Sequence, residues 1–158
     1  PEKEIWNYQQ IELGFNYRMT DLQAALGISQ MSRLDDYVTR RNEIARLYDA
    51  ELADLPLTLP WQSPHTESSY HLYPIRVLEA RAKITQRQIY EALWESGIAV
   101  NLHYIPVHRH PYYQNLGFKA GDFPEAEQFH REVISLQIYP GLTYNQQNNV
   151  RIALVTAL

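Results

Sequence analysis

The sequence contains no cysteine, which excludes disulfide bonds and thiolate metal sites. No apolar run approaches the roughly 18 residues that a membrane-spanning helix needs. The net charge of −4 provides no basic excess for nucleic-acid phosphates. We therefore expect a cytoplasmic protein whose partners include neither a membrane nor a nucleic acid.

Lysine is also scarce, and each copy lies in a polar or turn-like context: Lys3, Lys83 and Lys119. A lysine that forms a Schiff base needs partly desolvated surroundings, because these lower the pKa of its amine. None of the three meets this requirement, and the sequence contains no Gly-rich phosphate loop and no Ser–His–Asp ordering with motif support. We therefore predict no catalytic residue in this chain.

Three Thr-x-x-Gln patterns predict where helices begin. In this capping box the threonine hydroxyl accepts from the third helical N–H, and the glutamine side chain accepts from the N–H of the threonine. The three pairs are Thr20 with Gln23, Thr85 with Gln88, and Thr143 with Gln146. We expect one helix after each.

The first helix is predicted from Asp21 to about Leu52, with or without a break. Its apolar side chains recur at spacings of three, four or seven, which predicts one buried stripe. The stripe comprises Met31, Leu34, Val38, Ala45, Tyr48 and Leu52. Residues 22–31 are apolar on more than one side, so we expect them to be buried or at an interface.

The second half of the chain alternates between strand and helix patterns. A strand is predicted over 70–78, with Pro74 favouring an edge position or a bulge. A helix over 84–98 is expected to end at Gly97 in a left-handed turn. Further elements are a strand over 98–103, a helix from Pro124, a strand near 135–138 and a helix after Thr143. The domains expected are a junction segment (1–19), a linking helix region (20–54) and a small α+β domain (55–158).

Three histidines lie within eight residues: His103, His108 and His110. Their spacing matches no strong metal-ligand pattern, and no acidic residue is nearby in sequence, so we predict no metal site. Two other interpretations remain. The histidines and neighbouring tyrosines form a cleft that binds a polar ligand, or they are satisfied side chains in a packed loop.

A second candidate site precedes the first helix. The segment Gly14-Phe15-Asn16-Tyr17-Arg18-Met19 places a glycine, an amide and a guanidinium before a helix N-terminus. Helix N–H groups favour an anion at this position, and arginine can hold phosphate with two parallel hydrogen bonds. The alternative is that Arg18 pairs with Asp21.

The segment 14–27, GFNYRMTDLQAALG, resembles the signature of the DegT/DnrJ/EryC1/StrS sugar aminotransferases. The helix with Arg40-Arg41 is also typical of this family. The resemblance continues through 69–75, 97–98, 103–108, 111–113 and 139–143, and so covers nearly the whole chain. Within the family, the run from His103 to Tyr113 is most similar to members of the pseudaminic acid pathway.

The resemblance implies the small C-terminal domain of a fold-type I aminotransferase that uses pyridoxal 5′-phosphate (PLP). Such a domain is α+β, with a short, mainly antiparallel sheet packed with helices and preceded by a long linking helix. The full-length enzyme would move an amino group from L-glutamate to C4 of a UDP-linked 4-keto-6-deoxy-hexosamine. Its active site would be shared between the subunits of a homodimer.

The resemblance also assigns roles to individual residues. Asn16 would reach the PLP phosphate of the partner subunit, and Arg18 would face the cofactor or the nucleotide diphosphate. His103 and Tyr104 would line the sugar pocket, with His108 as a further candidate nearby.

The family's lysine would lie upstream of Pro1, so we expect this chain to be a piece of a longer protein and inactive alone. A different sugar nucleotide, a PLP-dependent dehydratase and a non-catalytic binding or dimerisation module remain as alternatives.

Overall fold

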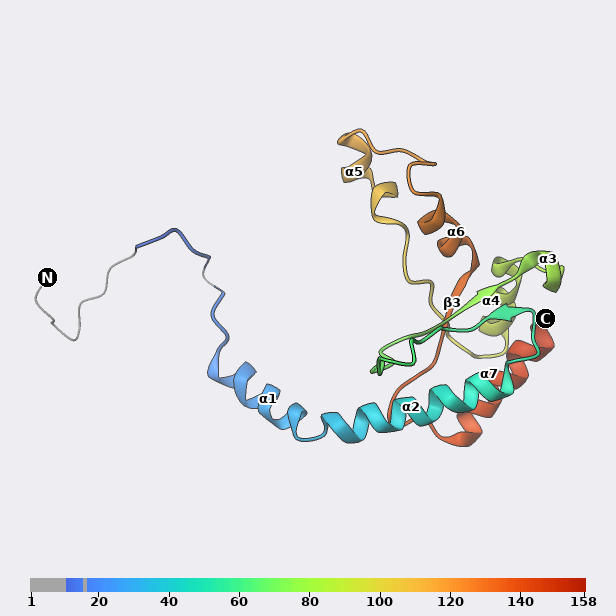
Figure 1. Cartoon of the computed structure of the whole chain (residues 1–158), viewed down its shortest axis with the longest axis horizontal. Helices are drawn as coiled ribbons and strands as arrows, with labels where there is room; N and C mark the ends of the chain where they lie inside the picture. The colour runs from blue at the N-terminus through green and yellow to red at the C-terminus, as the bar shows by residue number, and fades with distance from the viewer. Residues whose placement is uncertain (1–10, 16) are drawn as a thin grey trace, which may run out of the picture. The chain divides into compact units, whose positions relative to one another are not determined.

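The computed structural model describes residues 11–15 and 17–158 (Figure 1). The chain divides between Leu34 and Asp35 into two compact units. The domain boundaries expected from the sequence, 1–19, 20–54 and 55–158, stay a prediction. In chain order the elements are α1 (Asp21–Met31), α2 (Leu34–Glu51), β1 (Leu57–Thr58), β2 (Tyr73–Val77), α3 (Glu79–Ala82), α4 (Gln86–Glu95), η1 (Val107–Arg109), α5 (Pro111–Asn115), α6 (Pro124–Glu132), β3 (Val133–Leu136) and α7 (Tyr144–Ala157).

All three predicted capping boxes are present, at the starts of α1, α4 and α7. At α4, for example, the N–H of Gln88 donates to Thr85 Oγ1 at 3.3 Å, while the N–H of Thr85 donates to Gln88 Oε1 at 2.9 Å. Each box satisfies N–H groups that the first helical turn would leave without acceptors. The local sequence therefore determines these three helix starts.

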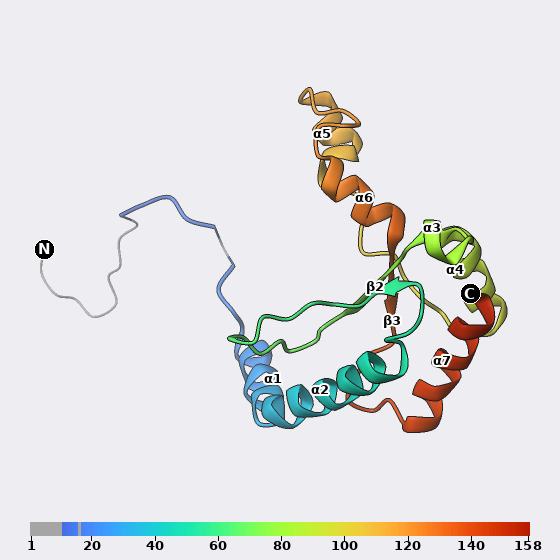
Figure 2. The same cartoon turned by 45° about the vertical axis from the view of Figure 1, so that its right-hand side comes forward.

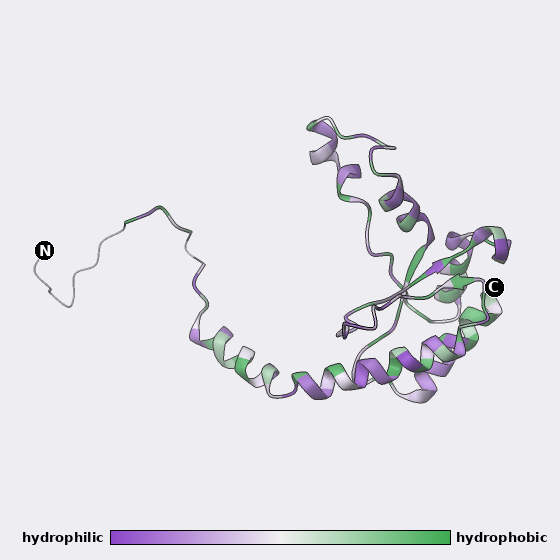
Figure 3. Ribbon diagram, viewed as in Figure 1, coloured by the Kyte–Doolittle hydropathy of each residue, from purple (hydrophilic) through white to green (hydrophobic). Residues whose placement is uncertain are grey.

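The long first helix is broken in two, at a turn formed by Ser32 and Arg33. The predicted stripe is buried only beyond this turn: Tyr48 and Leu52 are fully covered, whereas Met31 is 66% exposed. Helix α1 has no buried residue in this chain, so the expectation that 22–31 is buried here was wrong. Apolar colour nevertheless runs along much of α1 in Figure 3. Its place at an interface stays a prediction.

The sheet is antiparallel throughout, in the order β1-β2-β3, as the predicted fold class requires. Strand β2 lies between β1 and β3, but β1 does not reach Pro74, so the proline has a strand on one side only, as the predicted edge position requires. The proline is tolerated because β1 pairs only with Arg76 and Val77, which leaves no strand beside Pro74 on that side. On the other side Pro74 faces Ser135, whose N–H donates to the carbonyl of Asn101 instead.

The predicted strand over 98–103 was also wrong, since only an isolated bridge joins Asn101 to Ser135. The N–H of Leu102 donates to the Asn101 side chain at 2.8 Å, and this local hydrogen bond replaces a strand partner. The preceding helix end is as predicted: Gly97 has a φ of 77° and the N–H of Ile98 returns to the carbonyl of Leu93. The strand expected near 135–138 lies two residues earlier, as β3.

One core joins the sheet to α2, α4 and α7 within the second unit. Its largest members include the β2 residues Tyr73, Ile75 and Val77, and all four residues of β3 are buried. Two long-range hydrogen bonds fix the helices: Tyr48 Oη donates to the carbonyl of Gln137, and Gln147 Nε2 donates to that of Ile44. The core therefore supplies a rigid base for the segment that leaves the sheet after residue 101.

Candidate functional site

Residues 104–123 form an arm that leaves the sheet and returns at α6 (Figures 1 and 2). In both views α5 and α6 stand beside each other, away from α4 and α7. The sequence predicted only a loop here, whereas the arm contains the short helices η1 and α5. Pro111 opens α5, and a proline at a first helical position was the available signal.

His103 lies at the base of the arm, half-buried against β3. Its Nδ1 is 2.8 Å from the hydroxyl oxygen of Ser135, which fixes the imidazole ring. Among the residues that the structure describes, Nε2 has no hydrogen-bond partner. A ring held through one nitrogen can present the other nitrogen to a ligand, as donor or acceptor.

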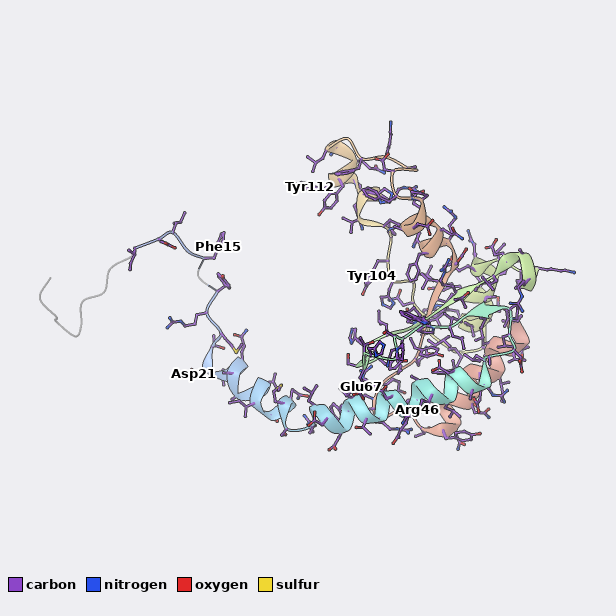
Figure 4. All side chains as sticks on the ribbon, viewed as in Figure 1. Phe15, Asp21, Arg46, Glu67, Tyr104 and Tyr112 are labelled. Carbon is purple, nitrogen blue, oxygen red and sulfur yellow. The ribbon has the colours of Figure 1, made fainter. Side chains whose placement is uncertain are left out.

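Tyr104 follows directly and is 69% exposed. Its ring meets the ring of His103 edge-on, with centroids 4.5 Å apart. The peptide bond between the two residues is cis. Figure 4 shows Tyr104 and Tyr112 projecting from the same side of the arm. The structure thus brings together the two residues predicted to line a sugar pocket, and leaves a phenol and an imidazole nitrogen available.

His108 is bonded differently from His103. It is only 6% exposed, its Nε2 lies 2.8 Å from Glu127 Oε1, and its ring packs 4.9 Å from that of Phe123. One of its two ring nitrogens is therefore engaged within the chain, and the ring as a whole is buried. The structure does not bring His108 to the open side occupied by Tyr104.

Glu127, on α6, is a residue that sequence reasoning missed. The hydrogen bond from His108 and the backbone N–H of Gly121 hold the pKa of its carboxyl below its usual range, with help from the Arg109 guanidinium and against the effect of burial. Nothing in its local sequence distinguishes it from an acidic residue in the first turn of any helix. Its partner His108 lies 19 residues away.

The anion site predicted ahead of α1 belongs to the first unit. Asn16 lies outside the described residues. Arg18 is exposed, two residues before Thr20, and among the described residues it forms no ion pair, including with Asp21. The alternative of an Arg18–Asp21 pair is therefore not realised, and the guanidinium has no intramolecular anion in that part of the chain.

The motif segments around Arg41 and Tyr70, which the resemblance singled out, are joined in the fold. Arg41 Nη1 contacts the carbonyl oxygens of Tyr70, His71 and Ile138 at 2.9, 3.2 and 2.7 Å. Tyr70 has a φ of 44°, in the left-handed region that a tyrosine rarely adopts. Arg41 thus ties α2 to the turn before β2 and to the segment after β3.

Lysines and possible metal ligands are the remaining side chains that could carry chemistry. Lys83 and Lys119 are exposed, and Lys3 lies outside the described residues. Within 11–15 and 17–158, no group of three or more His, Cys, Asp or Glu side chains could hold a metal ion. In the same residues, no helix combines the length and apolar character needed to cross a membrane.

A family model described as the DegT/DnrJ/EryC1/StrS aminotransferase family matches residues 2–155. The chain belongs to this family. The membership inferred from the motifs is thereby confirmed, since the match covers the segment before α1 as well as the arm and α7.

Three curated relatives illustrate the range of the DegT/DnrJ/EryC1/StrS family. The chain is 41% identical to an uncharacterized protein of Methanocaldococcus jannaschii, covering 87% of this chain and 36% of that protein. It is 38% identical to the spore coat polysaccharide biosynthesis protein SpsC of Bacillus subtilis, covering 92% and 38%. It is 31% identical to the UDP-4-amino-4,6-dideoxy-N-acetyl-beta-L-altrosamine transaminase of Campylobacter jejuni, covering 99% and 42%.

Solved structures confirm the predicted fold class. Helicobacter pylori PseC, an aminotransferase of pseudaminic acid biosynthesis, superposes with a TM-score of 0.87 at 29% identity, covering 99% of this chain and 42% of PseC. The PLP form of the sugar aminotransferase Spr1654 from Streptococcus pneumoniae gives 0.84 at 28% identity, covering 97% and 40%. The chain therefore spans about two fifths of the length of the relatives it matches.

Proposed function

We propose that this chain is the part of a PLP-dependent sugar aminotransferase that supplies substrate contacts. The full-length enzyme would act in the cytoplasm, as a homodimer, on L-glutamate and a UDP-linked 4-keto-6-deoxy-hexosamine in pseudaminic acid biosynthesis. The observation that carries the proposal is the pairing of an anchored His103 with an exposed Tyr104 at the base of the arm. This arrangement suits a polar ring that offers hydroxyl groups.

A second candidate is the same reaction on a different sugar nucleotide. The relative named for spore coat polysaccharide biosynthesis is more similar to this chain, at 38% identity, than the Campylobacter jejuni transaminase, at 31%. A few pocket contacts, worth roughly 1–3 kcal/mol, are enough to change which sugar is preferred. Assaying several keto sugar nucleotides side by side would separate the two candidates.

The described residues fit a role as contacts to PLP and to phosphate. They do not fit the role of the residue to which PLP is covalently attached. Arg18 is exposed, has no ion pair among the described residues and precedes the N-terminus of α1, a donor set that suits a phosphate. Lys83 and Lys119 are exposed, so neither offers the desolvated amine that attachment requires. When bound, PLP supplies an electron sink that lets an amino group pass between carbon atoms.

Each candidate site residue would then have a defined role in binding. Arg18 would hold a phosphate of the cofactor or of the nucleotide, and Asn16, by the family resemblance, would reach the cofactor phosphate in the partner subunit. His103 would orient a sugar hydroxyl through Nε2, because Ser135 already fixes Nδ1. Tyr104 would cover one face of the sugar ring and exclude water from it.

The test uses the full-length protein that contains this chain, with L-glutamate and the keto sugar nucleotide. His103→Ala should lower kcat/KM for the sugar about 10- to 100-fold, the effect of losing one buried polar contact, and leave the half-reaction with glutamate unchanged. His110→Ala is the matched control, because His110 is an exposed histidine of the same segment. The chain alone should give no turnover.

Three results would contradict the proposal. Turnover by the isolated chain would overturn the assignment of the reactive amine to another part of the protein. A defect of His103→Ala confined to glutamate would remove His103 from the sugar site. Equal effects of His103→Ala and His110→Ala would show that the anchored imidazole has no special role.

A further inference from the structure

Two residues near opposite ends of the arm are hydrogen-bonded to the same oxygen, Glu127 Oε1. Glu127 Oε1 lies 2.8 Å from His108 Nε2, near the start of the arm, and accepts the backbone N–H of Gly121, near its end, at 2.7 Å. Two guanidinium groups flank the other oxygen: Arg109 Nη1 is 3.6 Å and Arg131 Nη1 is 4.0 Å from Glu127 Oε2. Residues 13 apart in sequence are thereby closed into a loop through a side chain of α6.

Aromatic contacts also join the arm, because the ring centres of the pairs His108–Phe123, Phe118–Phe123 and Tyr113–Phe118 lie 4.9, 6.1 and 6.5 Å apart. Between its two ends is an apolar hollow of about 360 Å3, lined by Pro106, Val107, His108, Tyr113, Phe118, Phe123 and Ala126. All five phenylalanine and tyrosine side chains that the arm carries are at least 37% exposed: Tyr104, Tyr112, Tyr113, Phe118 and Phe123. Because these aromatic side chains stay partly exposed and no strand ladder holds the segment, we expect the polar links at Glu127 to contribute to its closure.

Helix α6 itself is anchored independently of the arm. Glu132, at its end, bonds to Arg76 of β2 at 2.6 and 2.8 Å, and the guanidinium of Arg76 lies 5.9 Å from the ring centre of Phe129. Removal of the Glu127 carboxylate should therefore leave α6 on the sheet and free the arm alone.

We propose that Glu127 is a positioning residue. Its hydrogen bonds to His108 and Gly121, here called the clasp, hold the arm closed and so fix the position of Tyr104 at the sugar acceptor. The inference rests on the proposed function, because it treats Tyr104 as a contact to the acceptor. Among the described residues, the hydrogen bonds and ion pairs of Glu127 join it to the arm and to Arg131 but not to Tyr104, so it acts on Tyr104 through the backbone. Pro106, between Tyr104 and His108, has a fixed φ and transmits a shift of His108 to the acceptor side.

His108 has a different role in this arrangement from the one that the family resemblance implied. Its buried Nε2 serves the clasp, so His108 contributes to the acceptor site through the position of the arm. A histidine at this position could bind a sugar or hold the arm. The hydrogen bond of His108 to Glu127 at 2.8 Å favours the role of holding the arm.

The experiment compares three variants of the full-length protein. Glu127→Ala removes the clasp, Glu127→Gln keeps an oxygen that can accept both hydrogen bonds, and Glu125→Ala removes an exposed glutamate from the same helix. Hydrogen exchange of residues 104–123 should become at least 10-fold faster in Glu127→Ala, with little change in the other two. In the same protein, kcat/KM for the keto sugar should fall 10- to 100-fold, while the glutamate half-reaction keeps its rate.

Hydrogen exchange tests the clasp, and kcat/KM for the keto sugar tests the link between the arm and the acceptor. Unchanged exchange in Glu127→Ala would overturn the clasp. Faster exchange with an unchanged kcat/KM for the sugar would overturn the link between the arm and the acceptor. If the unmodified protein turned over no keto sugar, the proposed function would fail, while the exchange experiment would still decide the clasp. Should Glu127→Ala not fold, His108→Leu breaks the same link from the arm, and slow exchange in it would also overturn the clasp.

Discussion

Replacement of Arg41 with alanine should destabilise the chain more than any other single arginine substitution on α2. The guanidinium nitrogen Nη1 contacts three backbone carbonyl oxygens from two separate segments, at 2.7 to 3.2 Å. Those segments contain Tyr70, with its left-handed φ of 44°, and Ile138, just after β3. Without Arg41 the turn before β2 loses the contact that offsets its backbone strain.

The magnitude follows from the number of hydrogen bonds that Nη1 can donate. One nitrogen carries two hydrogens, so three carbonyl contacts amount to about two full charge-assisted bonds, each contributing roughly 1.5 kcal/mol at a half-buried position. The free energy of unfolding should therefore fall by about 3 kcal/mol. For a chain of this size each kcal/mol shifts Tm by roughly 2–4 °C, so Tm should fall by about 6–12 °C.

Urea and thermal unfolding, followed by circular dichroism, measure this loss. Arg46→Ala is the control, because Arg46 is exposed on the same helix and the same change in helix propensity occurs there. Its unfolding free energy should stay within about 0.5 kcal/mol of the unmodified chain. If the two variants proved equally stable, the three carbonyl contacts would contribute nothing net and the reasoning would be refuted.

Two further predictions concern a turn and the response to acid. Gly97→Ala should cost about 1 kcal/mol in chemical unfolding, because an alanine is strained at a φ of 77°, while Gly27→Ala within α1 should raise helicity instead; equal effects would contradict this. The carboxyls of Glu127 and Glu132 both have a pKa below the ordinary 4.5; for Glu132 burial opposes the shift, and Gln128 and Arg76 outweigh it. Their stabilisation is complete above pH 4.5 and is lost as the pH falls through the lowered pKa of the folded state. Urea unfolding from pH 6 to 3 should show a smaller acid loss in Glu132→Gln than in Glu125→Gln, and an identical loss would exclude this linkage.

Local signals predicted the helices of this fold better than its strands. The capping boxes at Thr20, Thr85 and Thr143 mark helix starts because donor and acceptor lie three residues apart, within reach of a single turn. The alternation of apolar and polar residues at 98–103 had no such local hydrogen-bond signal behind it. A strand forms only where a neighbouring strand pairs with its backbone. There the N–H of Leu102 donates to the Asn101 side chain, and only a single bridge, between Asn101 and Ser135, remains.

The same distinction applies to the candidate site. Residue types and spacing identified His103, Tyr104 and His108 as chemically capable side chains, but a motif does not specify their partners. Those partners, Ser135 and Glu127, lie 32 and 19 residues away, and no periodicity relates such positions. Only the antiparallel pairing of β3, and the return of the chain at α6, bring them within 2.8 Å.

The partners decide which histidine can serve a ligand. A histidine anchored through one nitrogen by a hydroxyl keeps a second nitrogen for a substrate, as His103 does. A buried histidine whose Nε2 is hydrogen-bonded to a carboxylate oxygen, with two guanidinium groups beside that carboxylate, is held within the chain, as His108 is. Two histidines of one motif therefore separate into a candidate contact and a structural link. If the proposed full-length enzyme uses this site, we expect its sugar specificity to depend on both, on His103 at the acceptor and on His108 through the shape of the arm.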